Sequence, residues 1–152
     1  MNKYLFQNCQ KIVVFSEDNS KVLLAQRKGE SDFDSTYSFI GGKMEITDKD
    51  IIEGMRREKN EEVGEDFIIR LNPIYNSVIH YIKKDGNYML LPHYYAQYIR
   101  GEVKLNGEYS NYKWVPISEI DEFEPKITNI PEIIKRLLKI IPVMEDKDFV
   151  EI

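Results

Sequence analysis

Runs of apolar residues, separated by short polar loops, divide the chain into predicted strands. The runs are rich in Ile, Val, Leu and Tyr, which favour strands, and Gly, Asn, Asp and Ser supply turn chemistry between them. Pro92 lies inside one run and lacks the N–H that a β-ladder uses, so we expect an edge strand or a bulge there. The predicted strands are residues 10–15, 21–27, 37–40, 67–71, 75–82, 88–100 and 112–115.

Two other segments carry apolar residues at helical spacing. The first, residues 51–63, follows Asp50, a favourable N-cap, and Glu53 stands three residues later as its capping-box partner. Gly64 is placed to end this helix, and residues 131–141 form the second predicted helix. Strands and two helices in this order predict an α/β (α+β) fold, with a mixed β-sheet covered by helices.

Composition and charge narrow the class of protein. A length of 152 residues suits one compact domain, which we expect to comprise residues 1–152. No apolar run is long enough for a membrane span or a signal peptide, so we expect a cytoplasmic protein without a membrane partner. The net charge of −5 makes nucleic acid an unfavourable partner, and a homodimer is left open. Cys9 is the single cysteine, which excludes an internal disulfide, and we assign it no role.

Three glutamates share one face of the first predicted helix. Glu58, Glu61 and Glu62 stand at i, i+3 and i+4, where like charges repel unless a cation lies among them. Hard carboxylate oxygens suit Mg²⁺, with Mn²⁺ as the alternative. A solvated acidic helix face would have the same spacing. The upstream pair Gly41 and Gly42, which lets backbone approach a ligand closely, favours the metal site.

The two segments together resemble the Nudix box, whose pattern is G-x5-E-x7-R-E-U-x-E-E-x-G-U with U a bulky apolar residue. The opening Gly-Gly-Lys-Met-Glu and the ending Arg-Glu-x-x-Glu-Glu-Val-Gly match it in order and at nearly the expected distance. The order of strands and helices also resembles the whole Nudix fold, an α/β/α sandwich with a mixed β-sheet and a catalytic loop-helix-loop. The resemblance implies that Glu58, Glu61, Glu62 and the Gly41 carbonyl bind metal, and that Arg57 orients the glutamates.

The chain departs from the Nudix pattern in three respects. The interval between the glycine pair and Arg57 is one residue longer, so the first box glutamate has no direct counterpart, and Asp48 or Glu45 is the nearest carboxylate. Lys59 and Glu65 stand where the pattern has apolar residues. Lys59 lies on the side of the helix that packs inward, and we expect its stem to be buried while its ammonium reaches water.

The resemblance also implies a function. It implies Mg²⁺-dependent hydrolysis of a phosphoanhydride bond in a nucleoside diphosphate linked to another group, such as a nucleoside triphosphate or a dinucleoside polyphosphate. Gly42 is expected to contact substrate, and Glu108 is a further candidate metal ligand unless it is an ordinary loop glutamate. The alternative is a Nudix-fold nucleotide-binding or regulatory domain without hydrolysis. Retention of all three helix glutamates favours the enzyme.

Residues that recognise the substrate are less distinct in the sequence. Arg27 and Lys28 end a predicted strand beside the glycine loop, where they would meet substrate phosphates or serve only as a solubilising strand end. Tyr81 lies sixteen residues beyond the box, a spacing that resembles the tyrosine of dinucleoside-polyphosphate Nudix enzymes, although chance placement is easy among ten tyrosines. His80 and His93 have no partner at ligand spacing, so we expect structural histidines.

Overall fold

The computed structural model describes residues 5–30 and 32–152. The structure has two α-helices, α1 (Ile51–Val63) and α2 (Ile130–Ile140). It also has three short 3-10 helices, of which one follows β7 and two follow α2. The strands are β1 (Phe6–Phe15), β2 (Lys21–Arg27), β3 (Tyr37–Ser38), β4 (Ile40–Lys43), β5 (Ile68–Ile82), β6 (Tyr88–Arg100), β7 (Tyr109–Pro116) and β8 (Val150–Glu151).

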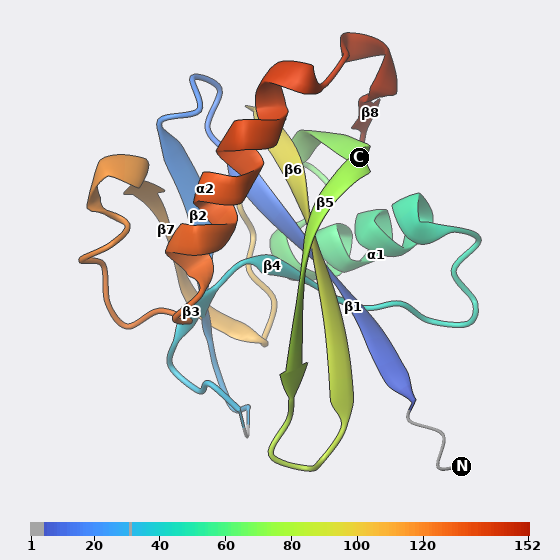
Figure 1. The fold of residues 1–152 in the computed structure, drawn as a ribbon, viewed down its shortest axis with the longest axis vertical. Helices are drawn as coiled ribbons and strands as arrows, with labels where there is room; N and C mark the ends of the chain where they lie inside the picture. The colour runs from blue at the N-terminus through green and yellow to red at the C-terminus, as the bar shows by residue number, and fades with distance from the viewer. Residues whose placement is uncertain (1–4, 31) are drawn as a thin grey trace.

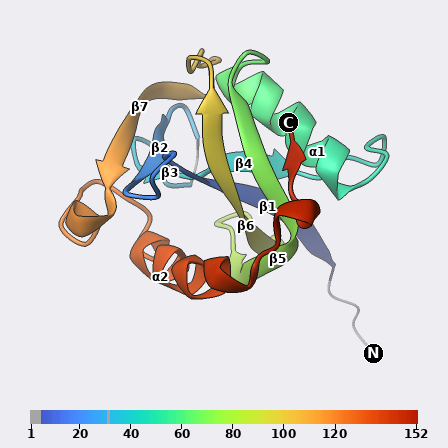
Figure 2. The same ribbon diagram turned by 90° about the horizontal axis from the view of Figure 1, so that it is seen from above.

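The strands form one mixed sheet between the two helices. Its order is β3-β2-β1-β6-β5-β8, with β4 beside β1 and β7 beside β2, and β1 runs parallel to β6 while the other pairs are antiparallel. Helix α1 lies on one face of the sheet and α2 on the other (Figures 1 and 2). The predicted α/β/α sandwich with a mixed sheet is confirmed. None of the helices in the described ranges is long and apolar enough to cross a membrane.

Strand β1 supplies both hydrophobic cores. Successive strand side chains point to opposite faces, so Ile12 and Val14 join the core beneath α1, whereas Val13 and Phe15 join the core beneath α2. All four side chains are fully buried. Burying such a side chain contributes roughly 1.5–3 kcal/mol relative to leaving it exposed. The strand therefore fixes the position of β4, which pairs with it and carries the glycine pair.

Local sequence signals set the bounds of α1, which are those predicted. The Asp50 side chain accepts a hydrogen bond from the Glu53 backbone N–H at 2.9 Å, as an N-cap does. Gly64 ends the helix with φ of 100°, in the region that favours glycine, and its N–H donates to the Asn60 carbonyl. The second bond of a capping box, from the N-cap backbone N–H to the Glu53 carboxylate, is replaced by an ion pair between Glu53 and Arg56.

The expectation of an edge strand or a bulge at Pro92 is wrong. Its strand, β6, is interior to the sheet, between β1 and β5, and its register with β5 is continuous through Pro92. The ladder between β1 and β6 has no pair between Asn8↔Leu90 and Lys11↔His93, and Pro92 lies opposite that gap. The interruption accommodates the missing N–H.

Two predicted strands, residues 67–71 and 75–82, are one strand in the structure. They form β5, whose register with β6 shifts between the two segments. Within that interval the Asn72 side chain accepts the backbone N–H of Ile74 at 2.9 Å. This local bond competes with the ladder, and it accounts for a turn-like signal inside a continuous strand.

Candidate active site

Strand β4 places the glycine pair directly against the acidic face of α1. The Gly41 N–H donates to Glu62 Oε2 at 2.7 Å. Gly41 has φ of 124°, and a Cβ there would lie 2.9 Å from the Lys11 Cα of the neighbouring strand. A Cβ on Gly42 would lie 2.6 Å from Glu58 Oε1, so it would displace the Glu58 carboxylate. Gly41 is therefore required for the close approach of β4 to β1, and Gly42 for the close approach of β4 to Glu58.

The three helix glutamates share a face, as predicted, but their surroundings differ. The Glu61 side chain is 55% exposed, that of Glu58 is 15% exposed, and Glu62 is buried. The acidic face therefore runs from solvent at Glu61 into the protein at Glu62. A merely solvated charge run would not bury one of its members, so the graded burial argues against that alternative.

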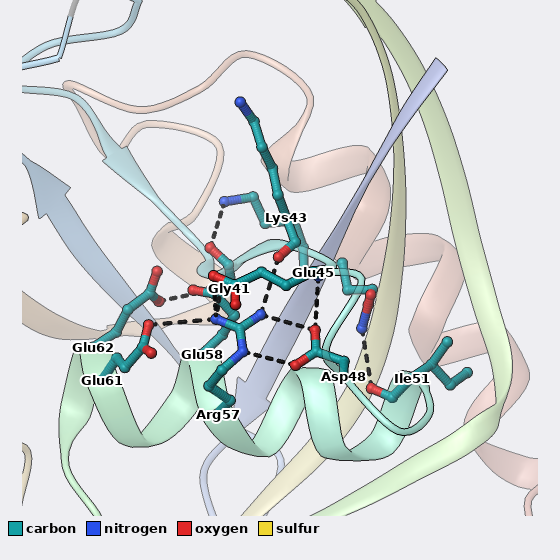
Figure 3. Close-up of polar contacts among 11 residues, drawn as sticks. Gly41, Lys43, Glu45, Asp48, Ile51, Arg57, Glu58, Glu61 and Glu62 are labelled. Carbon is teal, nitrogen blue, oxygen red and sulfur yellow. Dashed lines mark hydrogen bonds and ion pairs between the residues drawn. The ribbon is translucent and has the colours of Figure 1, made fainter. Parts of the chain in front are cut away.

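Arg57 holds the exposed end of this face through a network of ion pairs and charge-assisted hydrogen bonds (Figure 3). Its Nε and Nη2 donate to the two oxygens of Asp48 at 2.8 and 3.0 Å, and its Nη1 donates to Glu58 Oε1 at 2.9 Å. Glu61 Oε2 and Glu45 Oε1 are both 3.5 Å from Nη1. The bidentate contact makes Asp48, rather than the exposed Glu45, the main partner of Arg57.

Hydrogen bonding makes Asp48 a permanently charged partner. The Arg57 guanidinium, followed by the Glu45 backbone N–H, lowers the pKa of Asp48 to about 2. The bond to Asp48 in turn raises the pKa of Arg57. The pair stays ionised under ordinary conditions, and it fixes Arg57 against the side of Glu58.

Burial disfavours the charged form of Glu62. It raises the pKa of Glu62 to about 8, while Lys11 and the Gly41 N–H oppose the shift and the charges of Glu58 and Glu108 add to it. Burial also raises the pKa of Glu58, against the effect of Arg57. Carboxylates that repel one another in a low-dielectric setting are stabilised by a bound cation or by a proton.

The expectation that the Lys59 ammonium reaches water is wrong. Lys59 is 1% exposed, and its Nζ donates to the carbonyl of Phe67 at 2.8 Å and to that of Gly64 at 3.2 Å. These carbonyls belong to the chain that turns from α1 into β5, so the ammonium holds this turn against the end of the helix and satisfies two backbone acceptors. Burial lowers the pKa of Lys59.

A cavity of about 580 Å³ opens beside the glycine pair and the glutamates. One wall is polar and carries Glu58, Glu62 and Glu108 together with Gly41 and Gly42. Apolar side chains also line the cavity: Phe39, Ile79, Met89, Leu91, Ile127 and Ile130. The volume lies within the range of small-molecule sites, and the presence of both charged and apolar lining residues suits a ligand with a charged and an uncharged part.

Of the two predicted phosphate-binding residues, only Arg27 lines the cavity. Arg27 lines the cavity and pairs with Glu30, and its buried Nε has no hydrogen-bond partner among the described residues. Lys28 is exposed and does not line the cavity, although its backbone N–H donates to the Glu108 carbonyl at 3.0 Å. Arg27 is thus placed for a ligand, and Lys28 positions the Glu108 loop through its backbone.

Tyr81 lines the cavity, but its hydroxyl is engaged. It donates to Asp32 Oδ2 at 3.2 Å, and its ring lies 5.6 Å from that of Phe33. Burial, and then the charge of Asp32, raises the pKa of Tyr81 to about 12. Tyr81 therefore joins the loop before β3 to the end of β5, and the ring forms part of the cavity wall.

Two cavity residues were not anticipated from the sequence. Lys11 is buried in β1, and its Nζ donates to the Gly41 carbonyl at 3.3 Å. Tyr109 is buried beside Glu62, and burial, with the Glu62 charge, raises its pKa well above the usual range. The sequence did contain a signal for Lys11, because this lysine directly precedes the apolar run of β1, and that run is buried on both faces. Nothing in the sequence distinguished Tyr109 from nine other tyrosines.

The donor set fits a hard divalent cation, although the ligands are not gathered into a closed site. Among residues 5–30 and 32–152, no three His, Cys, Asp or Glu side chains lie in an arrangement that could hold a metal ion. Glu58 and Glu61 both contact Arg57, and Glu62 is bonded to the Gly41 N–H. The fit rests on the buried, mutually repelling carboxylates and on the backbone carbonyl that line one wall.

Comparison with known proteins agrees with this arrangement. A family model for the NUDIX domain matches residues 8–137. The chain belongs to the Nudix family. A comparison with curated protein sequences gave no match.

Solved structures share the fold at low sequence identity. A MutT protein from Methanosarcina mazei Go1 is 19% identical, with a TM-score of 0.72, over 91% of this chain and 97% of the other. A C. elegans Ap4A hydrolase in a binary complex is 14% identical, with a TM-score of 0.72, over 91% and 99%. The NUDIX domain of Shewanella oneidensis NrtR, complexed with ADP ribose, is 17% identical, with a TM-score of 0.69, over 91% and 90%.

Proposed function

We propose that this protein hydrolyses a phosphoanhydride bond in a nucleoside diphosphate linked to another group, with Mg²⁺, or alternatively Mn²⁺, as its cofactor. The observation that carries the proposal is the shared wall of one cavity, where Glu58, Glu62 and the Gly41 backbone lie together. A nucleoside triphosphate or a dinucleoside polyphosphate has the matching form, with a polyanionic chain joined to a flat, largely apolar base.

Glu58, Glu61, Glu62 and the Gly41 carbonyl would hold the cation, and Glu108 would join them from the loop before β7. When bound, a divalent cation supplies charge neutralisation at phosphorus and a water of lowered pKa. Arg57 fixes Glu58 through its own bond to Asp48, so the carboxylate does not need to be ordered when substrate arrives.

Arg27 is the proposed contact for the substrate phosphates. Its Nε is buried without a partner beside the cavity, and a phosphate oxygen would satisfy that donor. Gly42 would present its backbone to the phosphate chain, and the Tyr81 ring would form part of the base-binding wall. Lys28 stays a candidate only if its exposed side chain turns toward the cavity mouth.

A nucleotide-binding domain without hydrolysis is the second candidate function. It is favoured by the similarity of the fold to the NrtR NUDIX domain, which was crystallised with ADP ribose. The partner in either case is a small molecule. A cytoplasmic location remains a prediction, and a homodimer remains an open alternative.

A substrate screen separates the two candidates. The purified protein would be incubated with nucleoside triphosphates, dinucleoside polyphosphates, nucleotide sugars and ADP-ribose, with and without Mg²⁺, and the products separated by chromatography. We expect metal-dependent cleavage between phosphorus atoms in at least one class. Saturable binding of a nucleotide without product formation would support the binding domain instead.

A further inference from the structure

Lys11 places a positive charge on the same groups that are proposed to bind the metal ion. It extends from β1 to the cavity wall and is 7% exposed. Its Nζ donates to the Gly41 carbonyl at 3.3 Å, the only hydrogen bond that this ammonium makes with the described residues. The Gly41 N–H is bonded to Glu62, so one peptide residue joins the lysine to the buried carboxylate.

The charge of Lys11 reaches the neighbours of the Gly41 carbonyl. It opposes the rise that burial causes in the pKa of Glu62, and it adds to the burial that lowers the pKa of His93. Lys11 forms no ion pair with a described residue, whereas Arg57 is balanced by Asp48. The Lys11 charge is thus directed at the metal-binding wall and is not neutralised elsewhere.

We propose that Lys11 is a built-in competitor of the divalent cation, a positioning residue that holds the Gly41 carbonyl and balances Glu62 in the metal-free protein. This inference rests on the proposed function, because it takes the Gly41 carbonyl and Glu62 as ligands. A cation that binds there meets the positive charge of the ammonium on the same carbonyl oxygen, whether it shares that oxygen or displaces the ammonium from it. The protein thereby keeps a stable platform without metal, at the cost of weaker metal binding.

Electrostatics sets the size of the effect. A unit charge and a divalent cation about 5 Å apart repel strongly enough, even with the screening of bulk water, to change a binding constant roughly tenfold. The lysine stem lets Nζ move away when the cation enters, so the repulsion falls with that movement. We therefore expect removal of the Lys11 charge to tighten metal binding by about tenfold.

Three variants separate the charge of Lys11 from its hydrogen bond and from net charge. Lys11→Gln keeps a donor for the Gly41 carbonyl but removes the charge, and Lys11→Arg keeps the charge. Lys21→Gln is the matched control, because Lys21 is exposed at the start of β2 and its replacement changes net charge equally. The measurement is the dissociation constant for Mn²⁺ alone, by isothermal titration calorimetry, with thermal unfolding of each metal-free protein as the check on folding.

We expect Lys11→Gln to bind Mn²⁺ about tenfold more tightly than the wild type, and Lys11→Arg and Lys21→Gln to remain within about twofold. Unchanged or weaker binding by a folded Lys11→Gln would overturn the proposal while leaving the proposed function standing. A wild type that binds no Mn²⁺ in the absence of substrate, and shows no metal-dependent turnover, would contradict the proposed function itself.

Discussion

Replacing Gly42 with alanine should remove activity while leaving the fold intact. The new Cβ would lie 2.6 Å from Glu58 Oε1 and overlap the carboxyl carbon, so the carboxylate must move aside. That group is the end of a flexible side chain, and Gly42 does not have a positive φ. The unfolding free energy should therefore stay within about 1 kcal/mol of the wild type, because the loss of backbone entropy in the unfolded chain partly offsets the overlap.

The effect on catalysis should be much larger. A displacement of about 1 Å at a group that positions the reaction can cost roughly 100-fold in rate. We expect a loss of at least that size in kcat for Gly42→Ala, measured on the best substrate of the screen. The Arg57 bond to Glu58 would be broken by the same movement, which adds to the loss.

Gly41→Ala is the contrasting variant. Its Cβ would meet backbone atoms of β1, 2.9 Å from the Lys11 Cα, at a φ of 124° that alanine rarely adopts. Backbone cannot swing away, so the cost should reach about 3 kcal/mol and lower the melting temperature by roughly 6–12 °C. Equal losses of melting temperature in the two variants, or wild-type turnover by Gly42→Ala, would refute the argument that Gly42 is kept for Glu58.

Three further variants test separate parts of the account. Glu61→Gln should lower turnover by orders of magnitude and reduce the Mg²⁺-induced rise in melting temperature, with metal-free stability unchanged; an unaltered Mg²⁺ shift would show that Glu61 is only a surface residue. Burial lowers the pKa of His93 from 6.5 to about 4. Between these two pH values the unfolded chain binds a proton that the folded protein excludes, so the unfolding free energy should fall by at most about 3 kcal/mol as the pH drops from 6.5 to about 4. Urea unfolding across that pH range should show a weaker dependence for His93→Gln than for the exposed control His80→Gln, and parallel curves would contradict the assignment. Lys59→Met should lose about 1–3 kcal/mol, because the carbonyls of Phe67 and Gly64 lose their donor in a largely buried setting. Replacement of the exposed Lys139 by Met should be nearly neutral in the same assay.

Local signals predicted the parts of the fold that local interactions determine. The N-cap Asp50 and the C-terminal Gly64 gave the bounds of α1, because capping bonds join residues only three or four positions apart. The spacing of the glutamates likewise predicted their common face. The strand that contains Pro92 was misplaced in the sheet, since strand order depends on pairings between distant segments that periodicity does not encode.

The electrostatic layout of the site could not be predicted from the sequence. Glu61 and Glu62 are neighbours in the chain, yet one is largely exposed and the other buried, because β4 covers only one end of the acidic face. Lys59 was expected in water, but the turn from α1 into β5 brings two carbonyls to its ammonium. Lys11 acquires its role only when β1 and β4 pair. Such roles arise from tertiary contacts between segments far apart in sequence.

The central claim is that hydrolysis requires a divalent cation at the wall formed by the glycine pair and the glutamates. The most direct measurement is the turnover of the best substrate before and after addition of excess EDTA, followed by restoration of Mg²⁺. Cys9, Ser38 and His93 line the cavity but form no hydrogen bond with one another among the described residues, so they make no activated nucleophile. We therefore expect complete loss of turnover in EDTA and full recovery when Mg²⁺ is restored. Turnover that continues unchanged in excess EDTA would contradict it.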